Sequence, residues 1–180
     1  MNLKSKSKVI ATSALGFSVE LLVDIGQEDL DNILHLSKDL TKIFGEQGKL
    51  NETNIPKYFN SNTIQFLAKK NSKLVGFIIG APLEIFKRES WSRYDTNLGQ
   101  SNTIYTYFFY IEKKYRKKGG YAKTLKHIYL NYLKKKKYKY VTGHVKIGVS
   151  ENFGSNSEIV KIFQHWYGQN KPYEYYRRIL

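Results

Sequence analysis

The amino-acid sequence predicts an α/β fold in which a β-hairpin is followed by a β-α-β unit. Segments that alternate apolar and polar residues, as strands do, are separated by segments with the apolar spacing of helices. The chain has 180 residues, of which 41% are hydrophobic and 15% aromatic, a composition typical of packed globular proteins. We therefore expect one domain with a sizeable core at residues 15–180, preceded by a basic tail at residues 1–14.

The first part of the chain is expected to hold one strand and two helices. Residues 17–25 alternate in the manner of a strand. Residues 28–44 place apolar side chains three and four positions apart and begin with two acidic residues, which favours a helix. Asn54 and Pro56 predict the start of a short second helix at residues 55–59.

The middle of the chain is predicted to form a hairpin and then a buried strand. Residues 63–69 and 74–81 are rich in Ile, Val, Phe and Leu, and residues 71–73 between them suit a tight turn. A polar loop at residues 87–103 is expected to be exposed. Residues 104–111 are apolar or aromatic on both faces, so this strand is expected to be covered on both sides.

The last part of the chain is predicted to alternate helices and strands. Apolar positions at residues 121–133 recur on one face of a helix, and residues 138–145 suit a strand. Helical spacing between residues 159 and 166 predicts a last helix that begins at Asn156 or Ser157. A short aromatic strand at residues 173–180 closes the predicted order, β-α-α-β-β-β-α-β-α-β.

The formal net charge of +15 is concentrated in one segment. Residues 113–139 hold twelve Lys or Arg and no Asp or Glu. Such a basic field attracts anions, for example a phosphorylated cofactor or nucleic acid. For Lys134–Lys137, at a predicted helix end, a solvated face that favours the helix dipole is the simpler interpretation.

Several classes of site are excluded by composition. The chain has no cysteine, which excludes a disulfide framework and a cysteine nucleophile. Its four histidines show no pair at metal-ligand spacing, so no metal site is expected. No segment approaches the roughly 20 apolar residues of a membrane span, and no signal-peptide pattern is present. We expect a cytoplasmic protein with no membrane partner.

The most informative junction is a buried strand, a basic turn with two glycines, and an amphipathic helix. Glycine lets another group approach the backbone closely, and the first N–H groups of a helix have no partner within it. A pyrophosphate satisfies such groups, and Arg116, Lys117, Lys118 and Lys123 add charge nearby. The spacing fits neither the P-loop nor the dinucleotide fingerprint. On spacing alone, an anion site and an ordinary helix-entry loop remain equal alternatives.

Residues 110–125 resemble the cofactor-binding segment of GNAT acetyltransferases, which carries Arg/Gln-x-x-Gly-x-Gly/Ala after the fourth strand of the family. A match that starts at Lys117 places Gly120 and Ala122 in the small-residue positions, with Lys in place of Arg or Gln. We prefer this register because the following residues continue into the helix as family members do.

The alternative register of the motif starts at Arg116. It places Gly119 in the glycine position but leaves Tyr121 where Gly or Ala is expected. The preferred register requires one extra residue between strand and helix.

The resemblance covers roughly residues 63–170. It implies a mixed, mostly antiparallel central sheet flanked by helices on both faces, and it implies acetyl-CoA as the cofactor. Main-chain groups at the end of the buried strand would pair with the pantetheine arm, and amides of the turn would hold the pyrophosphate. The implied cofactor-binding residues are Phe109, Tyr110, Ile111, Arg116, Lys117, Lys118, Gly119, Gly120, Tyr121, Ala122 and Asn156.

In the GNAT family an Asn near the start of the last helix is followed seven residues later by a tyrosine that protonates the departing thiolate. Counting from Asn156, that position holds Phe163, which cannot donate a proton. Tyr167 lies one helical turn further on and is the predicted substitute. Three later tyrosines are alternatives, and ordinary aromatic packing is the simpler interpretation for any one of them. They are Tyr173, Tyr175 and Tyr176.

An amine acceptor must lose a proton before it attacks, so a base is required. Many family members use a carboxylate on the fourth strand, but residues 104–111 contain none. Glu112 is the predicted catalytic carboxylate, and Glu84, Asp95 or a water chain are the alternatives. Each acid also has a plain interpretation as a surface charge.

The resemblance implies an acetyl-CoA-dependent N-acetyltransferase that acts on a primary amine of a small molecule, peptide or protein. Two alternatives stay open: a GNAT-fold protein that binds or modifies RNA, such as aminoacyl-tRNA, through its basic surface, and a catalytically inactive coenzyme A-binding module. The sequence does not specify an oligomeric state, and a dimer is compatible with it.

Overall fold

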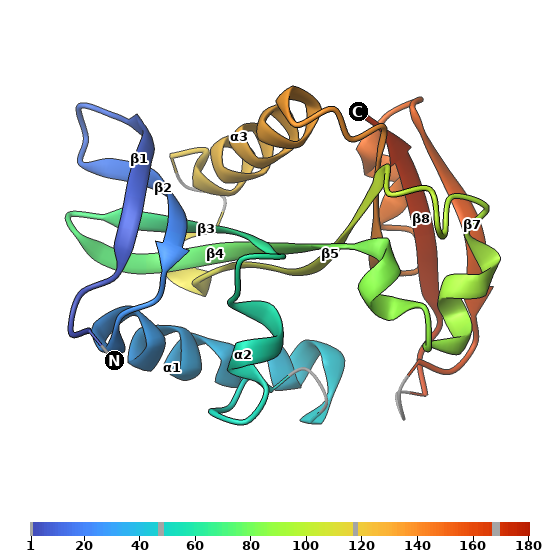
Figure 1. Cartoon of the computed structure of the whole chain (residues 1–180), viewed down its shortest axis with the longest axis horizontal. Helices are drawn as coiled ribbons and strands as arrows, with labels where there is room; N and C mark the ends of the chain where they lie inside the picture. The colour runs from blue at the N-terminus through green and yellow to red at the C-terminus, as the bar shows by residue number, and fades with distance from the viewer. Residues whose placement is uncertain (1, 47–48, 117–118, 167–169) are drawn as a thin grey trace. The chain divides into compact units, whose positions relative to one another are not determined.

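The computed structural model describes residues 2–46, 49–116, 119–166 and 170–180. Its strands form one mixed sheet in the order β1-β2-β3-β4-β5-β6-β8-β7 (Figure 1). The chain divides into two compact units, one of residues 1–80 and 108–129, the other of residues 81–107 and 130–180. Strand β5 and helix α3 contribute residues to both units, which are described in turn.

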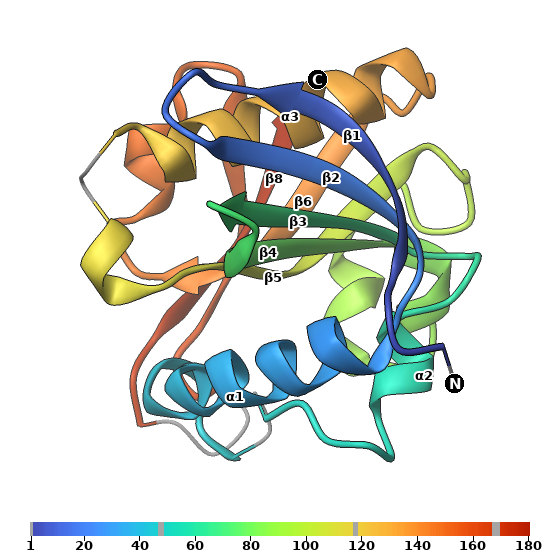
Figure 2. The same cartoon turned by 90° about the vertical axis from the view of Figure 1, so that its left-hand side faces the viewer.

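The first unit contains four antiparallel strands that are neighbours both in sequence and in the sheet. Figure 2 shows these strands with α1 on one face and α3 on the other. Its elements are β1 (Lys6–Thr12), β2 (Phe17–Asp24), α1 (Gln27–Phe44), α2 (Ile55–Tyr58), β3 (Ile64–Lys70), most of β4 (Lys73–Pro82), the end of β5 (Thr103–Ile111), the 3-10 turn η4 (Lys113–Tyr115) and the beginning of α3 (Tyr121–Lys135).

The tight hairpin between β3 and β4 is confirmed. Asn71 and Ser72 both have positive φ, 48° and 64°, and lie between the paired residues Lys70 and Lys73. Two central residues with positive φ make a turn whose twist matches that of the flanking strands, and Asn tolerates this conformation.

The core of the first unit is built from the inner faces of its strands and helices. Fully buried side chains include Ile33 and Leu40 of α1, Phe66 of β3 and Leu125 of α3. Phe66 meets the ring of Tyr129 edge to face, with ring centroids 6.2 Å apart. The helical spacing predicted for α1 and α3 therefore places their apolar sides against the sheet.

The second unit combines a short parallel strand pair with two antiparallel pairs. Strands β5 and β6 pair in parallel over Thr103–Tyr105 and Tyr140–Thr142. Its elements are the 3-10 turns η2 (Leu83–Phe86), η3 (Ser90–Tyr94) and η5 (Ser150–Phe153), the beginning of β5, the end of α3, and strands β6 (Tyr140–Lys146), β7 (Ser157–Phe163) and β8 (Tyr173–Ile179).

The prediction of a last helix after Asn156 is wrong, because residues 157–163 form strand β7. The register of β7 against β8 shifts between Ile159 and Lys161. This irregularity breaks the two-residue alternation and leaves apolar positions at intervals that imitate a helix. The run of β-branched residues at 159, 160 and 162 is the signal that favoured a strand.

Two further segments differ from expectation. Strand β1 lies inside residues 1–14, where the sequence predicted only a basic tail, and it pairs with β2. The boundary at residue 15 and the single-domain organisation stay predictions. The loop at residues 87–103 is not exposed throughout, since Trp91 and Asp95 are buried there. The polar composition of this loop gave no sign of the 3-10 turn at residues 90–94, whose Trp91 side chain packs in the core.

Candidate functional site

The predicted cofactor segment lies within the first unit. At the end of β5, Phe109 is 39% exposed, whereas Tyr110 and Ile111 are buried. The Lys126 Nζ atom lies 5.5 Å from the centre of the Phe109 ring. Phe109 is thus the residue of this strand end whose side chain remains accessible beside α3.

Strands β4 and β5 approach each other closely at Gly76. A Cβ atom at Gly76 would lie 2.5 Å from the Tyr110 carbonyl oxygen and 2.4 Å from Cδ1 of Ile111. One residue further on, the Glu112 N–H donates to the Val75 carbonyl at 2.8 Å. Glycine is required here because any side chain would push the end of β5 away.

Two consecutive glycines with left-handed backbone lead into helix α3. Gly119 has φ of 56° and Gly120 has φ of 66°, and the Thr124 N–H donates to the Gly120 carbonyl at 2.9 Å. A Cβ atom at Gly119 would lie 2.8 Å from the Tyr121 ring, but one at Gly120 would meet no atom within 4 Å. The backbone at Gly120 therefore faces open space at the start of the helix.

The start of α3 is anchored by an aromatic contact. The Tyr121 ring stacks on Phe17 of β2 with centroids 4.4 Å apart, and the Tyr115 ring lies 6.1 Å from it. Ala122 is half-buried and Lys123 is exposed. Lys117 and Lys118, which the sequence placed at the pyrophosphate, lie outside the described residues.

These features together make a site that fits a phosphorylated ligand. The first turn of a helix offers unpaired N–H groups and the positive end of its dipole, and the glycine turn leaves them accessible. A side chain on Gly120 would occupy the open space at the start of the helix. Exposed lysines at 113 and 123 add positive charge.

The Arg116 side chain contacts the end of β5 in the structure. Its Nε–H donates to the Ile111 carbonyl at 2.7 Å, and its guanidinium carbon lies 5.2 Å from the centre of the Tyr110 ring. The predicted role of Arg116 as a cofactor ligand stays a prediction, and its side chain is already bonded to the end of β5.

Tyr110 connects β5 to helix α1. Its hydroxyl donates to Oδ2 of Asp39 at 2.7 Å. This hydrogen bond, with a second from Lys42, lowers the pKa of Asp39. Burial, together with the same bond to Asp39, raises the pKa of Tyr110, which therefore stays protonated at neutral pH.

Glu112 differs from the other candidate bases in having a buried oxygen without a hydrogen-bond partner among the described residues. Its Oε1 atom pairs with Lys114 Nζ at 3.0 Å. Its Oε2 atom is buried and has no hydrogen-bond partner among the described residues. Buried carboxylate oxygens are normally satisfied, so this atom is available to accept a proton or hydrogen bond in a complex.

Glu84 and Asp95, the alternative bases, belong to the second unit and are already bonded. Glu84 Oε1 accepts from the N–H groups of Gly99 and Ser101, which closes a surface loop. Asp95 is buried and accepts from the Tyr175 hydroxyl at 2.8 Å and from Arg177 at 2.9 Å. The hydrogen bonds of Glu84 and Asp95 therefore stabilise a loop and the core of the second unit.

Asn156 precedes strand β7 rather than a helix. Its side-chain N–H donates to the Ile179 carbonyl at 2.7 Å, and its carbonyl accepts from the Ile179 N–H. The residues from Ser157 to Phe163 therefore do not form the helix on which the count from Asn156 was based. Tyr167 lies outside the described residues, so its catalytic role and the cofactor role of Asn156 stay predictions.

The three later tyrosines all lie in the buried core of the second unit, in β8. Burial raises the pKa of Tyr173 and of Tyr175, and it raises the pKa of Tyr176 to about 12. Their rings fill the core, which agrees with the packing interpretation.

His144 of β6 is a buried polar group that the sequence did not single out. Its Nδ1 atom lies 2.9 Å from the Tyr105 hydroxyl, and its ring stacks against Trp166 with centroids 3.5 Å apart. Among the described residues, its Nε2 atom has no hydrogen-bond partner. The sequence predicted a strand over this position, but a histidine within a strand gives no signal of which ring atoms remain unpaired.

Burial of His144 predicts that stability depends on pH. Desolvation lowers the pKa of His144 well below 6.5. Between that folded-state pKa and about 6.5 the unfolded chain binds the additional proton, so stability falls as the pH falls below about 6.5. We expect His144→Phe to reduce this slope by at most about 1.4 kcal/mol per pH unit. Urea unfolding at pH 7 and 5.5 measures this pH dependence, and His165→Gln, at an exposed position, is the control. An unchanged pH dependence in His144→Phe would contradict the claim that burial of His144 causes it.

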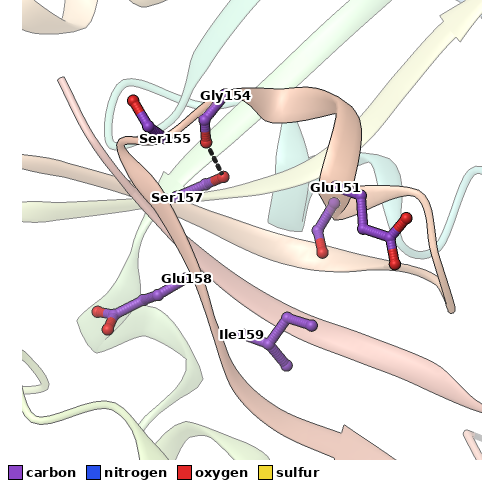
Figure 3. A pocket seen from close by; sticks show the side chains of 7 residues that line it. Glu151, Gly154, Ser155, Ser157, Glu158 and Ile159 are labelled. Atoms are coloured by element: carbon purple, nitrogen blue, oxygen red, sulfur yellow. Dashed lines mark hydrogen bonds between the residues drawn. The ribbon is translucent and has the colours of Figure 1, made fainter.

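The second unit also carries a surface pocket of about 480 Å³ beside η5 and the start of β7. Figure 3 shows the carboxylates of Glu151 and Glu158 and the side chain of Ile159 along it. Glu158 is held by Arg177, with Nη2 and Oε1 2.7 Å apart. The pocket combines negative charge with one apolar side chain in a chain that is otherwise strongly basic.

The basic run Lys134–Lys137 is exposed at and beyond the end of α3. This position agrees with a solvated helix end whose charges favour the helix dipole. Within the described part of the chain, no helix combines the length and the hydropathy that crossing a membrane requires.

Comparison with solved structures identifies the fold. Arabidopsis thaliana NAA60 in complex with acetyl-CoA matches with a TM-score of 0.66 and 17% identity, over 91% of this chain and 99% of NAA60. The ribosomal-protein-S18-alanine N-acetyltransferase of Escherichia coli matches with a TM-score of 0.64 and 11% identity, over 91% of this chain and 93% of that enzyme. A GNAT-family protein from Desulfovibrio desulfuricans matches with a TM-score of 0.63 and 7% identity, over 91% and 98% of the two chains.

The resemblance to GNAT acetyltransferases is thus confirmed for the fold, and the chain has the GNAT fold. The predicted mixed, mostly antiparallel sheet with helices on both faces is confirmed with it. Neither a protein-family model nor a curated protein matches the sequence. At these low identities the likeness concerns the fold and leaves activity to be argued from the site.

Proposed function

We propose that this GNAT-fold chain is an N-acetyltransferase, which transfers an acetyl group from acetyl-CoA to a primary amine by direct attack. The observation that carries the proposal is the junction of buried strand, left-handed glycine turn and helix start in the first unit. Similar structures include NAA60 bound to acetyl-CoA and an enzyme named for acetylating an alanine of a ribosomal protein.

The residues present suit the cofactor. Amides at the start of α3 and exposed Lys123 would hold the pyrophosphate, while main-chain groups at the end of β5 would bind the pantetheine arm. The Ile111 carbonyl already accepts from Arg116, which leaves Phe109 and Tyr110 as the better-suited main-chain partners. Acetyl-CoA would supply the thioester, whose carbon is open to attack by an amine.

Glu112 is the carboxylate that best suits the base. An ammonium acceptor has to give up a proton before its nitrogen can attack, and Glu112 Oε2 is buried without a partner among the described residues. Glu84 and Asp95 are already used by loop and core contacts. The identity of the thiolate proton donor stays open, with Tyr167 as a prediction.

Release of free thiol from acetyl-CoA tests the proposal. Purified protein would be screened against small amines, peptides with free N-termini and aminoacyl-tRNA, so that the RNA-directed alternative is included. Acceptor-dependent thiol release supports the enzyme. Binding of acetyl-CoA without release for any acceptor class would favour the inactive coenzyme A-binding module.

A further inference from the structure

The loop between β5 and α3 is held at its start by Arg116. Residues 113–115 form the short turn η4, after which Arg116 has extended backbone with φ of −69° and ψ of 143°. From this position its side chain turns back, and Nε–H donates to the Ile111 carbonyl at 2.7 Å. The bond closes a ring over the four intervening residues, so it fixes where the chain leaves strand β5.

The guanidinium of Arg116 is also held by contacts with neighbouring side chains. It lies over the Tyr110 ring, 5.2 Å from the ring centre, and Tyr110 is itself fixed by its 2.7 Å hydrogen bond to Asp39 of α1. Asp39 and Arg116 attract each other, and this attraction contributes to the lowered pKa of Asp39. Stacking on an aromatic face and partial neutralisation by a carboxylate both favour a held guanidinium over a freely solvated one.

We infer that Arg116 is a positioning residue, which fixes the glycine turn to the end of β5 and is itself held by Tyr110 and Asp39, rather than a ligand of the cofactor phosphates. The inference rests on the proposed function for its ligand, acetyl-CoA. It also extends the site to Asp39, a residue of helix α1 that the cofactor does not need to touch.

The two roles predict opposite effects for Asp39→Asn. If Arg116 contacts the phosphates directly, removing a nearby negative charge strengthens binding of the anionic cofactor. If Arg116 positions the turn, Asp39→Asn weakens the contacts that hold Arg116 over Tyr110. Acetyl-CoA binding then becomes about threefold weaker, a free-energy change smaller than that of one charged hydrogen bond. Glu28→Gln also removes one negative charge from the same helix, at an exposed position outside this contact network, and serves as the matched control.

Two variants of Arg116 separate charge from geometry. Arg116→Lys keeps the charge but lacks the planar guanidinium that bonds Ile111 while stacking on Tyr110. We expect Arg116→Lys and Arg116→Gln to weaken acetyl-CoA binding by about the same factor, roughly tenfold. Adding Asp39→Asn to Arg116→Gln is expected to cause no further loss, because both act through one contact network.

The experiment combines calorimetry of acetyl-CoA with hydrogen–deuterium exchange of the free protein. Amides of residues 119–125 are expected to exchange about fivefold faster in Arg116→Gln than in the wild type, since the start of the loop is released. Unchanged exchange, tighter binding by Asp39→Asn, or rescue by Arg116→Lys would overturn the positioning role. A wild-type protein that does not bind acetyl-CoA would instead overturn the proposed function, while the exchange measurement would still decide whether Arg116 holds the turn.

Discussion

Replacement of Glu112 by Gln is expected to lower the turnover number at least about 100-fold, the usual size of a general-base contribution. Gln keeps the size of the side chain but cannot accept a proton. The buried Oε2 atom without a partner among the described residues is the observation behind this expectation. Affinity for acetyl-CoA should stay close to that of the wild type, because the substitution affects deprotonation of the acceptor amine and not the pyrophosphate site.

Steady-state rates with an acceptor found by the thiol-release screen would measure this effect. Glu28→Gln, an exposed carboxylate in the first turn of α1, is the matched control and should retain wild-type turnover. If Glu112→Gln also keeps wild-type turnover, the proton goes to another group, and the surface-charge interpretation of Glu112 is correct.

Gly120→Val is expected to weaken acetyl-CoA binding at least about tenfold, equivalent to about 1.4 kcal/mol. Two causes act in the same direction. Valine is strained at φ of 66°, and its side chain would occupy the open space in front of the first turn of α3. Both the geometry of the turn and the approach of a phosphate would therefore be affected.

Two controls separate these causes from a general loss of stability. Gly99→Val introduces the same side chain at φ of 89°, where a Cβ atom also meets nothing within 4 Å, but in the second unit. Lys135→Ala removes a charge at the far end of α3. Calorimetry should show wild-type affinity for both controls, and equal affinities for Gly120→Val and Lys135→Ala would place the pyrophosphate elsewhere.

The fold was predictable wherever one periodicity dominated a segment. The Asn71-Ser72 turn, the largely apolar and aromatic strand β5 and the amphipathic helix α3 each have a local signal that the structure confirms. Strand β7 was mistaken for a helix because its bulge spaces apolar residues irregularly, and most of its side chains are exposed. Strand β1 was missed because an edge strand with an exposed, basic sequence lacks the alternation that burial imposes.

The candidate site was predictable as a chain segment but not as a set of contacts. The glycine pair and the surrounding basic residues left an anion site and an ordinary helix-entry loop as equal alternatives, and the structure shows positive φ at both glycines. No sequence pattern indicates that Arg116 turns back onto Ile111, because that contact depends on Tyr110 and on Asp39, 71 residues earlier than Tyr110. The atoms of Glu112 and His144 that have no hydrogen-bond partner in the described part of the chain likewise depend on three-dimensional surroundings.

Thermal and chemical unfolding with and without acetyl-CoA tests the central claim most directly. A ligand present at about 100 times its dissociation constant, and bound by the folded state alone, adds roughly 2.7 kcal/mol to the free energy of unfolding. We expect a stabilisation of this size for the wild type and a clearly smaller one for Gly120→Val at the same concentration. An unfolding transition that millimolar acetyl-CoA leaves unchanged would contradict the assignment of the glycine turn as its binding site.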